Sequence, residues 1–173
     1  MFTTQYRLHG KHAEMAEALL RAFNEQDESD GKGTKKLLFN RLLDIVLCAP
    51  LVGLAYSRKA PFDSSGGYTT VFADQIIHEK KRLMTNFRLI MLLDNKAEPD
   101  IEKRIDYAFR INNDADLKDQ MDLYDSYVRG GVEVLYEGII GAGATTAQDV
   151  LGNLMDFLDD YEQDIVGETD AKK

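Results

Sequence analysis

The longest apolar stretch of the chain runs over residues 45–56 and is interrupted only by Pro50 and Gly53. It is too short to cross a bilayer, which requires roughly 20 consecutive apolar residues. A helix that is apolar on nearly every side has to be covered on every side. The stretch therefore predicts the central and most buried helix, around which the remaining elements pack.

The composition is that of an ordinary globular protein. The chain has 173 residues, of which 44% are hydrophobic and 29% are charged, enough to bury a core as one domain. Three prolines and no tryptophan favour long, uninterrupted helices. The single cysteine, Cys48, excludes an internal disulfide and indicates a reducing, cytoplasmic compartment. Residues 1–10 are polar and mixed, so we expect no signal peptide and no membrane association.

Apolar residues recur at helical spacing along most of the chain, which predicts an all-α fold. We expect a single compact bundle of five to six helices over residues 1–166, followed by a frayed tail over 167–173. The central apolar helix would pack against the third and fifth helices. The expected helices are 11–25, 35–56, 70–93, 100–110, 116–140 and 146–165.

Proline and glycine mark the expected irregularities. Pro50 lies inside the second helix and predicts a kink or a break near Ala49, because proline lacks an N–H. Gly130 and Gly131 lie in the fifth helix, where they either permit a close helix approach or mark a break. Residues 2–8 are expected to be an extended lead-in, and residues 26–34 and 58–70 to be loops.

The charge is unevenly distributed along the chain. Residues 1–110 contain 17 Lys and Arg against 15 Asp and Glu, whereas residues 111–173 contain 4 against 15. A fold built from these two parts presents two electrically different faces, which steers partners and suppresses wrong ones. The net charge of −9 disfavours binding of the whole molecule to nucleic acid, although a local basic patch would still bind it.

The basic residues have two interpretations. They form a patch that contacts nucleic acid or an acidic partner, or they form a solvated helix exterior balanced by nearby acids such as Asp74, Glu79 and Asp106. A patch requires the third helix to cross the end of the second. The candidates are Arg58, Lys59, Lys80, Lys81, Arg82 and Arg88.

The last helix is expected to be acidic outside and apolar inside. Asp156, Asp159 and Asp160 would dock a basic protein surface, serve solubility, or pair with the basic patch of a second copy and so produce a homo-oligomer. The residues expected to face inward are Val150, Leu151, Leu154, Phe157, Leu158 and Tyr161.

Asp74, Glu79 and Lys81 have the residue types of a metal-dependent nuclease, in which carboxylates hold Mg²⁺ and a lysine supports the attacking water. Such residues normally lie at a sheet edge, whereas this segment is expected to be helical. A solvated helix face is therefore the favoured interpretation, with the nuclease as an alternative.

Three other sequence patterns do not predict a cofactor-binding, metal-binding or catalytic site. Residues 141–146 approach a dinucleotide fingerprint but follow a helix and lack the third glycine, so a linker between helices is favoured. The acidic residues between 114 and 125 lack the glycine and glutamate of an EF-hand. Cys48 is expected to be a small buried hydrophobe. We predict no catalytic residue, no metal and no cofactor.

Three stretches together resemble small helical accessory proteins of bacterial anti-phage systems, of the type associated with DNA phosphorothioation (Dnd). Residues 6–12 form the first stretch. The second is an apolar helix with Asp44, Ala49 and Gly53 that precedes Arg58-Lys59, and the third contains Tyr127 with Gly130-Gly131. The resemblance implies a non-enzymatic subunit of a larger DNA-targeting assembly and transfers no active-site residue.

These observations favour an accessory or adaptor subunit that binds protein partners, with an ATPase or nuclease subunit among them. Contact with DNA would pass through the partner. Two alternatives remain: a DNA-binding regulator that uses the basic helix 80–88, and a metal-dependent nuclease that uses Asp74, Glu79 and Lys81. The first predicts binding that weakens steeply with salt, and the second predicts Mg²⁺-dependent cleavage.

Overall fold

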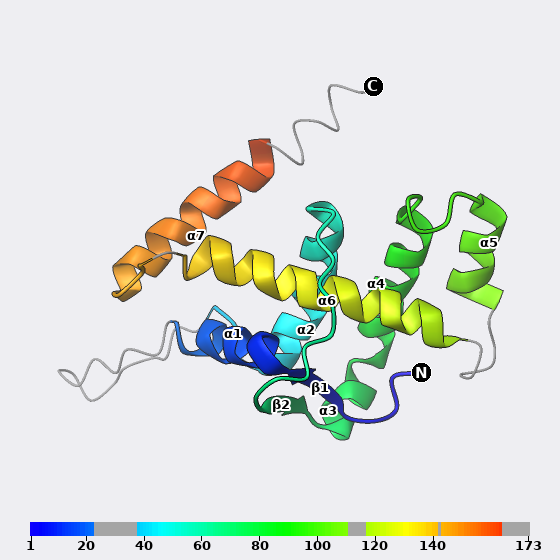
Figure 1. Ribbon diagram of the computed structural model, residues 1–173, viewed down its shortest axis with the longest axis horizontal. Helices are drawn as coiled ribbons and strands as arrows, with labels where there is room; N and C mark the ends of the chain where they lie inside the picture. The colour runs from blue at the N-terminus through cyan, green and yellow to red at the C-terminus, as the bar shows by residue number, and fades with distance from the viewer. Residues whose placement is uncertain (23–37, 111–116, 142, 164–173) are drawn as a thin grey trace.

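The computed structural model describes residues 1–22, 38–110, 117–141 and 143–163 (Figure 1). The fold is mainly helical, as predicted, with one short sheet. Its elements in chain order are β1 (Tyr6–His9), α1 (Gly10–Arg21), α2 (Leu42–Ala55), β2 (Tyr68–Val71), α3 (Ala73–His78), α4 (Lys80–Leu93), α5 (Ile101–Ile105), the π-helical turn η1 (Asp106–Arg110), α6 (Lys118–Ile139) and α7 (Ala147–Tyr161).

The sheet is a departure from the all-α prediction. β1 and β2 pair antiparallel, with Tyr6 opposite Val71 and His9 opposite Tyr68. The extended lead-in predicted over residues 2–8 contains most of β1, but its partner lies where a loop and the start of a helix were expected. The segment Tyr68-Thr-Thr-Val71 is rich in β-branched and aromatic residues, which suit a half-buried pleated surface.

Several helix boundaries also differ from the prediction. The second helix begins at Leu42 because Asp44 accepts the backbone N–H of Arg41 at 3.0 Å and caps the helix there. The predicted third helix is divided at Glu79 into α3 and α4. The predicted fourth helix continues from α5 into η1. The described part of the chain thus contains more helices than the five to six expected. The predicted loop 26–34 and tail 167–173 lie outside the described residues.

The packing of α2 against α6 forms the centre of the molecule (Figure 1), and it is the most extensive contact between two elements. Three glycines allow the backbones to approach. A Cβ on Gly131 would overlap the carbonyl oxygen of Ala49, and one on Gly53 would overlap that of Tyr127. Of the alternatives considered for Gly130-Gly131, the structure shows close approach, since α6 runs unbroken through both residues.

The central helix is largely buried, although Leu51 is 37% exposed, and it does not break at proline. α2 continues through Pro50 to Ala55. The missing N–H at Pro50 and the bulk of its ring disturb the carbonyls one turn earlier. The carbonyl oxygen of Leu47 accepts a 2.7 Å hydrogen bond from the buried side-chain amide of Asn86 on α4. The carbonyl oxygen that loses its helical donor at Pro50 is that of Val46, so the bond to Leu47 is a separate contact that ties α2 to α4.

α4 completes the core beside this pair. Leu83, Phe87 and Ile90 are buried on α4, and the ring of Phe87 lies 6.0 Å from that of Tyr124 on α6. No helix in the described part of the chain is both long and apolar enough to cross a membrane.

We expect the substitution Gly131→Ala to lower the free energy of unfolding by about 1–3 kcal/mol or more, because the added methyl group forces the helix backbones apart. Chemical denaturation monitored by circular dichroism measures this effect. The matched control is Gly152→Ala on α7, where a Cβ meets no atom within 4 Å. That change is expected to be neutral or to stabilise by up to about 1 kcal/mol. Equal effects of the two substitutions would contradict the close-approach interpretation.

Candidate partner-binding surface and polar pocket

α7 lies at the outer edge of the fold and is held along one side (Figure 1). Its start is well defined, because Thr146 and Asp149 form a capping box. The ring of Phe157 stacks 5.8 Å from that of Tyr56 and covers Gly138 of α6. The amide of Asn153 donates to the carbonyl oxygen of Ile139 at 3.1 Å. These contacts occupy one face of the helix and leave the opposite side exposed.

The exposed side of α7 carries an apolar stripe. Leu151, Met155 and Leu158 are 50%, 60% and 55% exposed. They recur at spacings of four and three residues, so they share one face of the helix. The sequence interpretation placed Leu151 and Leu158 inside and was wrong, because the inward face is narrower than their spacing suggested. Met155 was not recognised.

An acidic row runs beside this stripe. Asp156, Asp159 and Asp160 are exposed. At 100° per residue Asp159 lies about 40° from Met155, whereas Asp156 and Asp160 lie about 100° and 140° from it, farther around the same exposed side. The helix contains no Lys or Arg. We call the apolar stripe and the acidic row together the α7 face; it consists of Leu151, Met155, Asp156, Leu158, Asp159 and Asp160.

The candidate basic residues occupy separate places. Lys59 lies 3.4 Å from Asp94, directly after the end of α4, whereas Lys80 begins α4. A 14-residue helix is about 21 Å long, so these two lysines lie at opposite ends of it. Arg82 pairs with Glu79 at 3.5 Å. Arg88 donates to the carbonyl oxygen of Ala108 at 3.2 Å.

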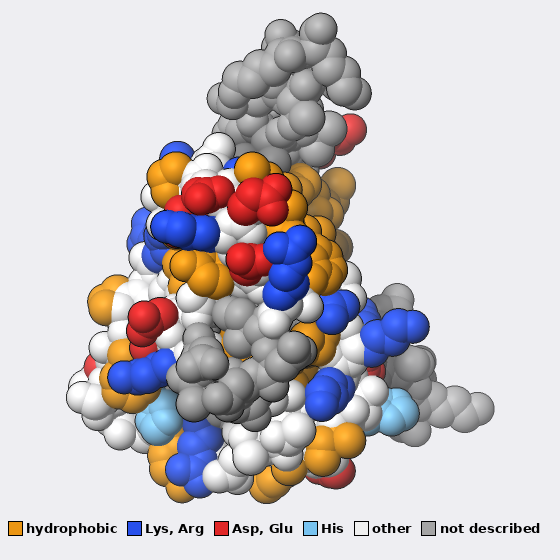
Figure 2. Space-filling view, turned by 90° about the vertical axis from the view of Figure 1, so that its right-hand side faces the viewer, with side chains coloured by type: hydrophobic (Ala, Val, Ile, Leu, Met, Phe, Trp, Pro, Cys, Tyr) orange, Lys and Arg blue, Asp and Glu red, His pale blue; other side chains and the backbone are white. Residues whose placement is uncertain are grey.

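Figure 2 shows the side of the molecule on which α5 lies. Lys and Arg side chains are interspersed there with acidic and hydrophobic ones and form no continuous basic surface. Lys80 and Lys81 are exposed at the start of α4 and have no ion pair within the described ranges. Arg82, next to them, is also exposed but pairs with Glu79.

Arg58 belongs to a charge network around the buried Glu133 of α6, which is 5% exposed. One carboxylate oxygen accepts from Lys11 at 2.8 Å and from His12 at 3.1 Å, and the other lies 3.1 Å from Arg58. Burial favours a higher pKa for Glu133, but the hydrogen bonds from Lys11, His12 and Arg58 outweigh it and hold the pKa below its usual value. The network ties α1 and the end of α2 to α6.

His12 is fully buried in the same network. Burial lowers the pKa of its imidazole, against the effect of Glu133, because the charged form loses its hydration. The neutral ring donates from Nε2 to the carboxylate. Its Nδ1 has no hydrogen-bond partner among the described residues.

The three residues of the nuclease alternative lie on α3 and at the start of α4. Glu79 forms ion pairs with Arg82 and, at 3.8 Å, with Arg41. Within residues 1–22, 38–110, 117–141 and 143–163, no group of three or more His, Cys, Asp or Glu side chains is arranged to hold a metal ion. Burial raises the pKa of the Cys48 thiol, which keeps it protonated and weakly nucleophilic.

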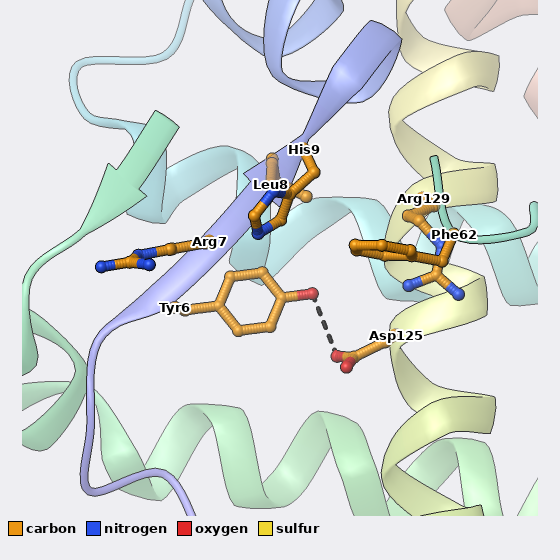
Figure 3. Close-up of a pocket in the computed structure, with 7 residues that line it drawn as sticks. All are labelled: Tyr6, Arg7, Leu8, His9, Phe62, Asp125 and Arg129. Atoms are coloured by element: carbon orange, nitrogen blue, oxygen red, sulfur yellow. Dashed lines mark hydrogen bonds between the residues drawn. The ribbon is translucent and has the colours of Figure 1, made fainter. Parts of the chain in front are cut away.

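A polar pocket of about 130 Å³ lies between β1, the loop after α2, and α6 (Figure 3). The hydroxyl of Tyr6 donates to the carboxylate of Asp125 at 3.0 Å. Burial raises the pKa of Asp125 to about 6, against the opposing effects of Tyr6 and Arg129. The residues that line the pocket are Tyr6, Arg7, Leu8, His9, Phe62, Asp125 and Arg129.

Comparison of the chain with protein-family models, with curated proteins and with solved structures found no match. The site is therefore interpreted from its own geometry. The sequence contained one signal for the pocket, since Asp125 and Arg129 stand one helical turn apart on α6. Nothing in the sequence indicated that β1 brings Tyr6 and His9 opposite them.

Replacing Glu133 with alanine is expected to lower the free energy of unfolding by about 2 kcal/mol, since His12 loses its buried hydrogen-bond partner. Arg58 and Lys11 are half exposed and can be rehydrated, which limits the loss. Glu137→Ala is the control: it removes an exposed carboxylate that pairs with the same Arg58 at 3.3 Å, and it should cost less than about 1 kcal/mol. Urea denaturation at neutral pH compares them. Similar losses for both would show that burial of Glu133 is unimportant.

We expect the difference in stability between Asp125→Asn and the wild type to shift in favour of the variant as the pH rises from acid to neutral. Because the pKa of Asp125 is raised from 3.8 to about 6, the folded protein holds this proton more tightly than the unfolded chain. The contribution of Asp125 to stability is therefore lost as pH rises through this interval. We expect the variant to gain about 1 kcal/mol between pH 4 and pH 7.5 relative to the wild type, after allowance for solvent around this partly buried group. Thermal unfolding at both pH values tests this, and a pH-independent difference would contradict it.

Proposed function

We propose that this protein is a non-enzymatic accessory subunit that binds a basic segment of a partner protein through the α7 face. One observation carries the proposal. Leu151, Met155 and Leu158 form an exposed apolar stripe beside an acidic row, on a helix without a basic residue. Exposed apolar side chains rimmed by charge are typical of protein interaction sites.

The energetics favour a partner that contacts both the apolar stripe and the acidic row of the α7 face. Burying the exposed half of each of the three apolar side chains contributes about 1 kcal/mol per residue. This sum is smaller than the roughly 4–15 kcal/mol that association costs in lost translation and rotation. Contacts beyond the stripe, including those of the acidic row, therefore have to contribute to the affinity.

The chemistry of the partner follows from the α7 face. An amphipathic helix with an apolar stripe and Lys or Arg along one edge complements it. A segment with acidic residues at that edge would be repelled, so Asp156, Asp159 and Asp160 supply discrimination and faster encounter as well as attraction.

The resemblance to Dnd-associated accessory proteins supplies the context that we propose: a cytoplasmic, DNA-targeting defence assembly in which the partner is an ATPase or nuclease subunit. The net charge of −9 supports DNA contact through that partner. The proposed role needs no metal and no cofactor.

The alternative of a DNA-binding regulator is supported by the exposure of Lys80 and Lys81 at the start of α4. It predicts that affinity for duplex DNA falls steeply between low and physiological salt, because phosphate contacts release counterions. Replacing Lys80, Lys81 and Arg82 with Glu would abolish such binding and leave binding through α7 unchanged.

The test of the α7 face uses a fluorescent helical peptide with a leucine stripe and lysines at the remaining positions. We expect Leu158→Glu to weaken binding at least about tenfold, the effect of losing about 1.4 kcal/mol. Reversing Asp159 and Asp160 to Lys should weaken it most at low salt. Phe72→Glu is the matched control, because Phe72 is 63% exposed but lies before α3.

Two results would contradict the proposal. One is equal binding of a peptide with the same leucines and glutamates in place of lysines. The other is a Leu158→Glu variant that still copurifies stoichiometrically with a partner encoded by the neighbouring genes when they are expressed together.

A further inference from the structure

The polar pocket contains hydrogen-bonding groups that the fold does not use. Oδ1 of Asp125 accepts from Tyr6, whereas Oδ2 has no hydrogen bond to any residue of the described ranges. Nε of Arg129 donates to the carbonyl oxygen of Ala60 at 3.0 Å, and its two terminal nitrogens have no hydrogen-bond acceptor in the described part of the chain. Figure 3 shows the carboxylate and the guanidinium facing the same space.

Aromatic rings form the rest of this space. The rings of His9 and Phe62 lie 5.3 Å apart, centroid to centroid, and the ring of Tyr6 lies beside them (Figure 3). The guanidinium of Arg7 points away and lies 4.6 Å over the ring of Tyr68. A ligand therefore meets one acidic group, one basic group and three flat side chains.

We propose that this pocket binds the hydrogen-bonding edge of a guanine base, a ligand beyond the partner-binding role proposed above. Guanine presents a carbonyl oxygen beside two N–H donor groups on one edge. The carbonyl oxygen accepts from the terminal nitrogens of Arg129, and the two donor groups face the carboxylate of Asp125. Flat bases also stack on aromatic side chains, which contributes roughly 1–3 kcal/mol per base.

The pattern of donors and acceptors selects guanine over adenine. On the corresponding edge adenine places its amino donor where guanine has the carbonyl oxygen, so the donor faces the terminal nitrogens of Arg129. Its unprotonated ring nitrogen, an acceptor, faces the carboxylate of Asp125, and neither hydrogen bond forms. A site whose buried polar groups are left unpaired rejects the wrong ligand strongly. Asp125, whose Oδ1 already accepts from Tyr6 and whose Oδ2 is unused within the described ranges, thus acts together with Arg129 as the specificity determinant.

The size of the pocket limits what enters. Its volume of about 130 Å³ is below the roughly 300–1,000 Å³ of sites for drug-sized ligands. It admits the ring system, and the sugar and phosphate remain outside in solvent. The same base chemistry comes either from a free guanine nucleotide or from an unpaired guanine in a single strand, and the experiment separates these sources.

The test measures binding of GMP and AMP by calorimetry and by NMR shifts of the Tyr6 and His9 rings. We expect GMP to bind and AMP to bind at least tenfold more weakly. Asp125→Asn, whose fold is expected to be intact, should weaken GMP binding at least tenfold, because an amide presents a donor where the base needs an acceptor. The matched control is Asp122→Asn, an exposed carboxylate on the same helix, which should leave binding unchanged.

A single-stranded oligonucleotide of guanine and thymine forms the second arm. Tighter binding than GMP, lost in Asp125→Asn, assigns the ligand to nucleic acid, and weaker binding than GMP assigns it to the free nucleotide; both support a guanine site. The proposal is overturned if GMP causes no shift at millimolar concentration, if AMP binds equally well, or if Asp125→Asn binds GMP like the wild type. It is also overturned if glycine or phenylalanine displaces GMP, which would show a site for a zwitterionic amino acid.

Discussion

The close approach of α2 and α6 is the constraint on which the other features of this protein depend. The carbonyl oxygen of Ala49 occupies the space that a side chain on Gly131 would need. Glycine costs about 1 kcal/mol in a helix interior relative to alanine. The close contact between the two backbones is therefore gained at the expense of the intrinsic stability of α6. With the backbones this close, α2 can be covered on the side that faces α6 without bulky side chains between them.

This packing sets where the polar groups of α6 lie. The backbone of Arg58 rests against Gly130, which brings its guanidinium to the buried Glu133, while α1 supplies Lys11 and His12 from the other side. On the same helix, Arg129 lies about one turn before Glu133 and Asp125 about one turn before Arg129, and both line the polar pocket together with residues of β1. The same helix thus contributes a closed network, in which both carboxylate oxygens are used, and an open one, in which hydrogen-bonding groups remain available. That difference separates a structural cluster from a candidate binding site.

α7 stands apart from this core in both packing and charge. Phe157 and Asn153 attach it to α6 and α2, and Leu151, Met155 and Leu158 remain exposed. An uncovered apolar stripe beside charge of a single sign is the kind of surface that marks interaction sites. The last third of the chain has a local excess of 11 negative charges, and in the described structure its acidic residues are divided mainly between α6 and α7. On α7, Asp156, Asp159 and Asp160 are exposed and no basic residue of the helix balances them.

The sequence by itself determined the mainly helical class, the buried central helix and the approximate position of most helices, because hydrophobic periodicity is a local property that survives without knowledge of neighbours. It also singled out Gly130-Gly131, but it did not decide whether the pair permits a close helix approach or marks a break in the helix. Only the tertiary structure decided that these glycines lie against the backbone of α2 and of the loop after it, and that Glu133 is buried among Lys11, Arg58 and the neutral His12. It also decided that Tyr6 reaches Asp125 and that Leu158 faces solvent. Each of these depends on residues far apart in the chain being brought together, and spacing along one helix carries no information about what packs against it.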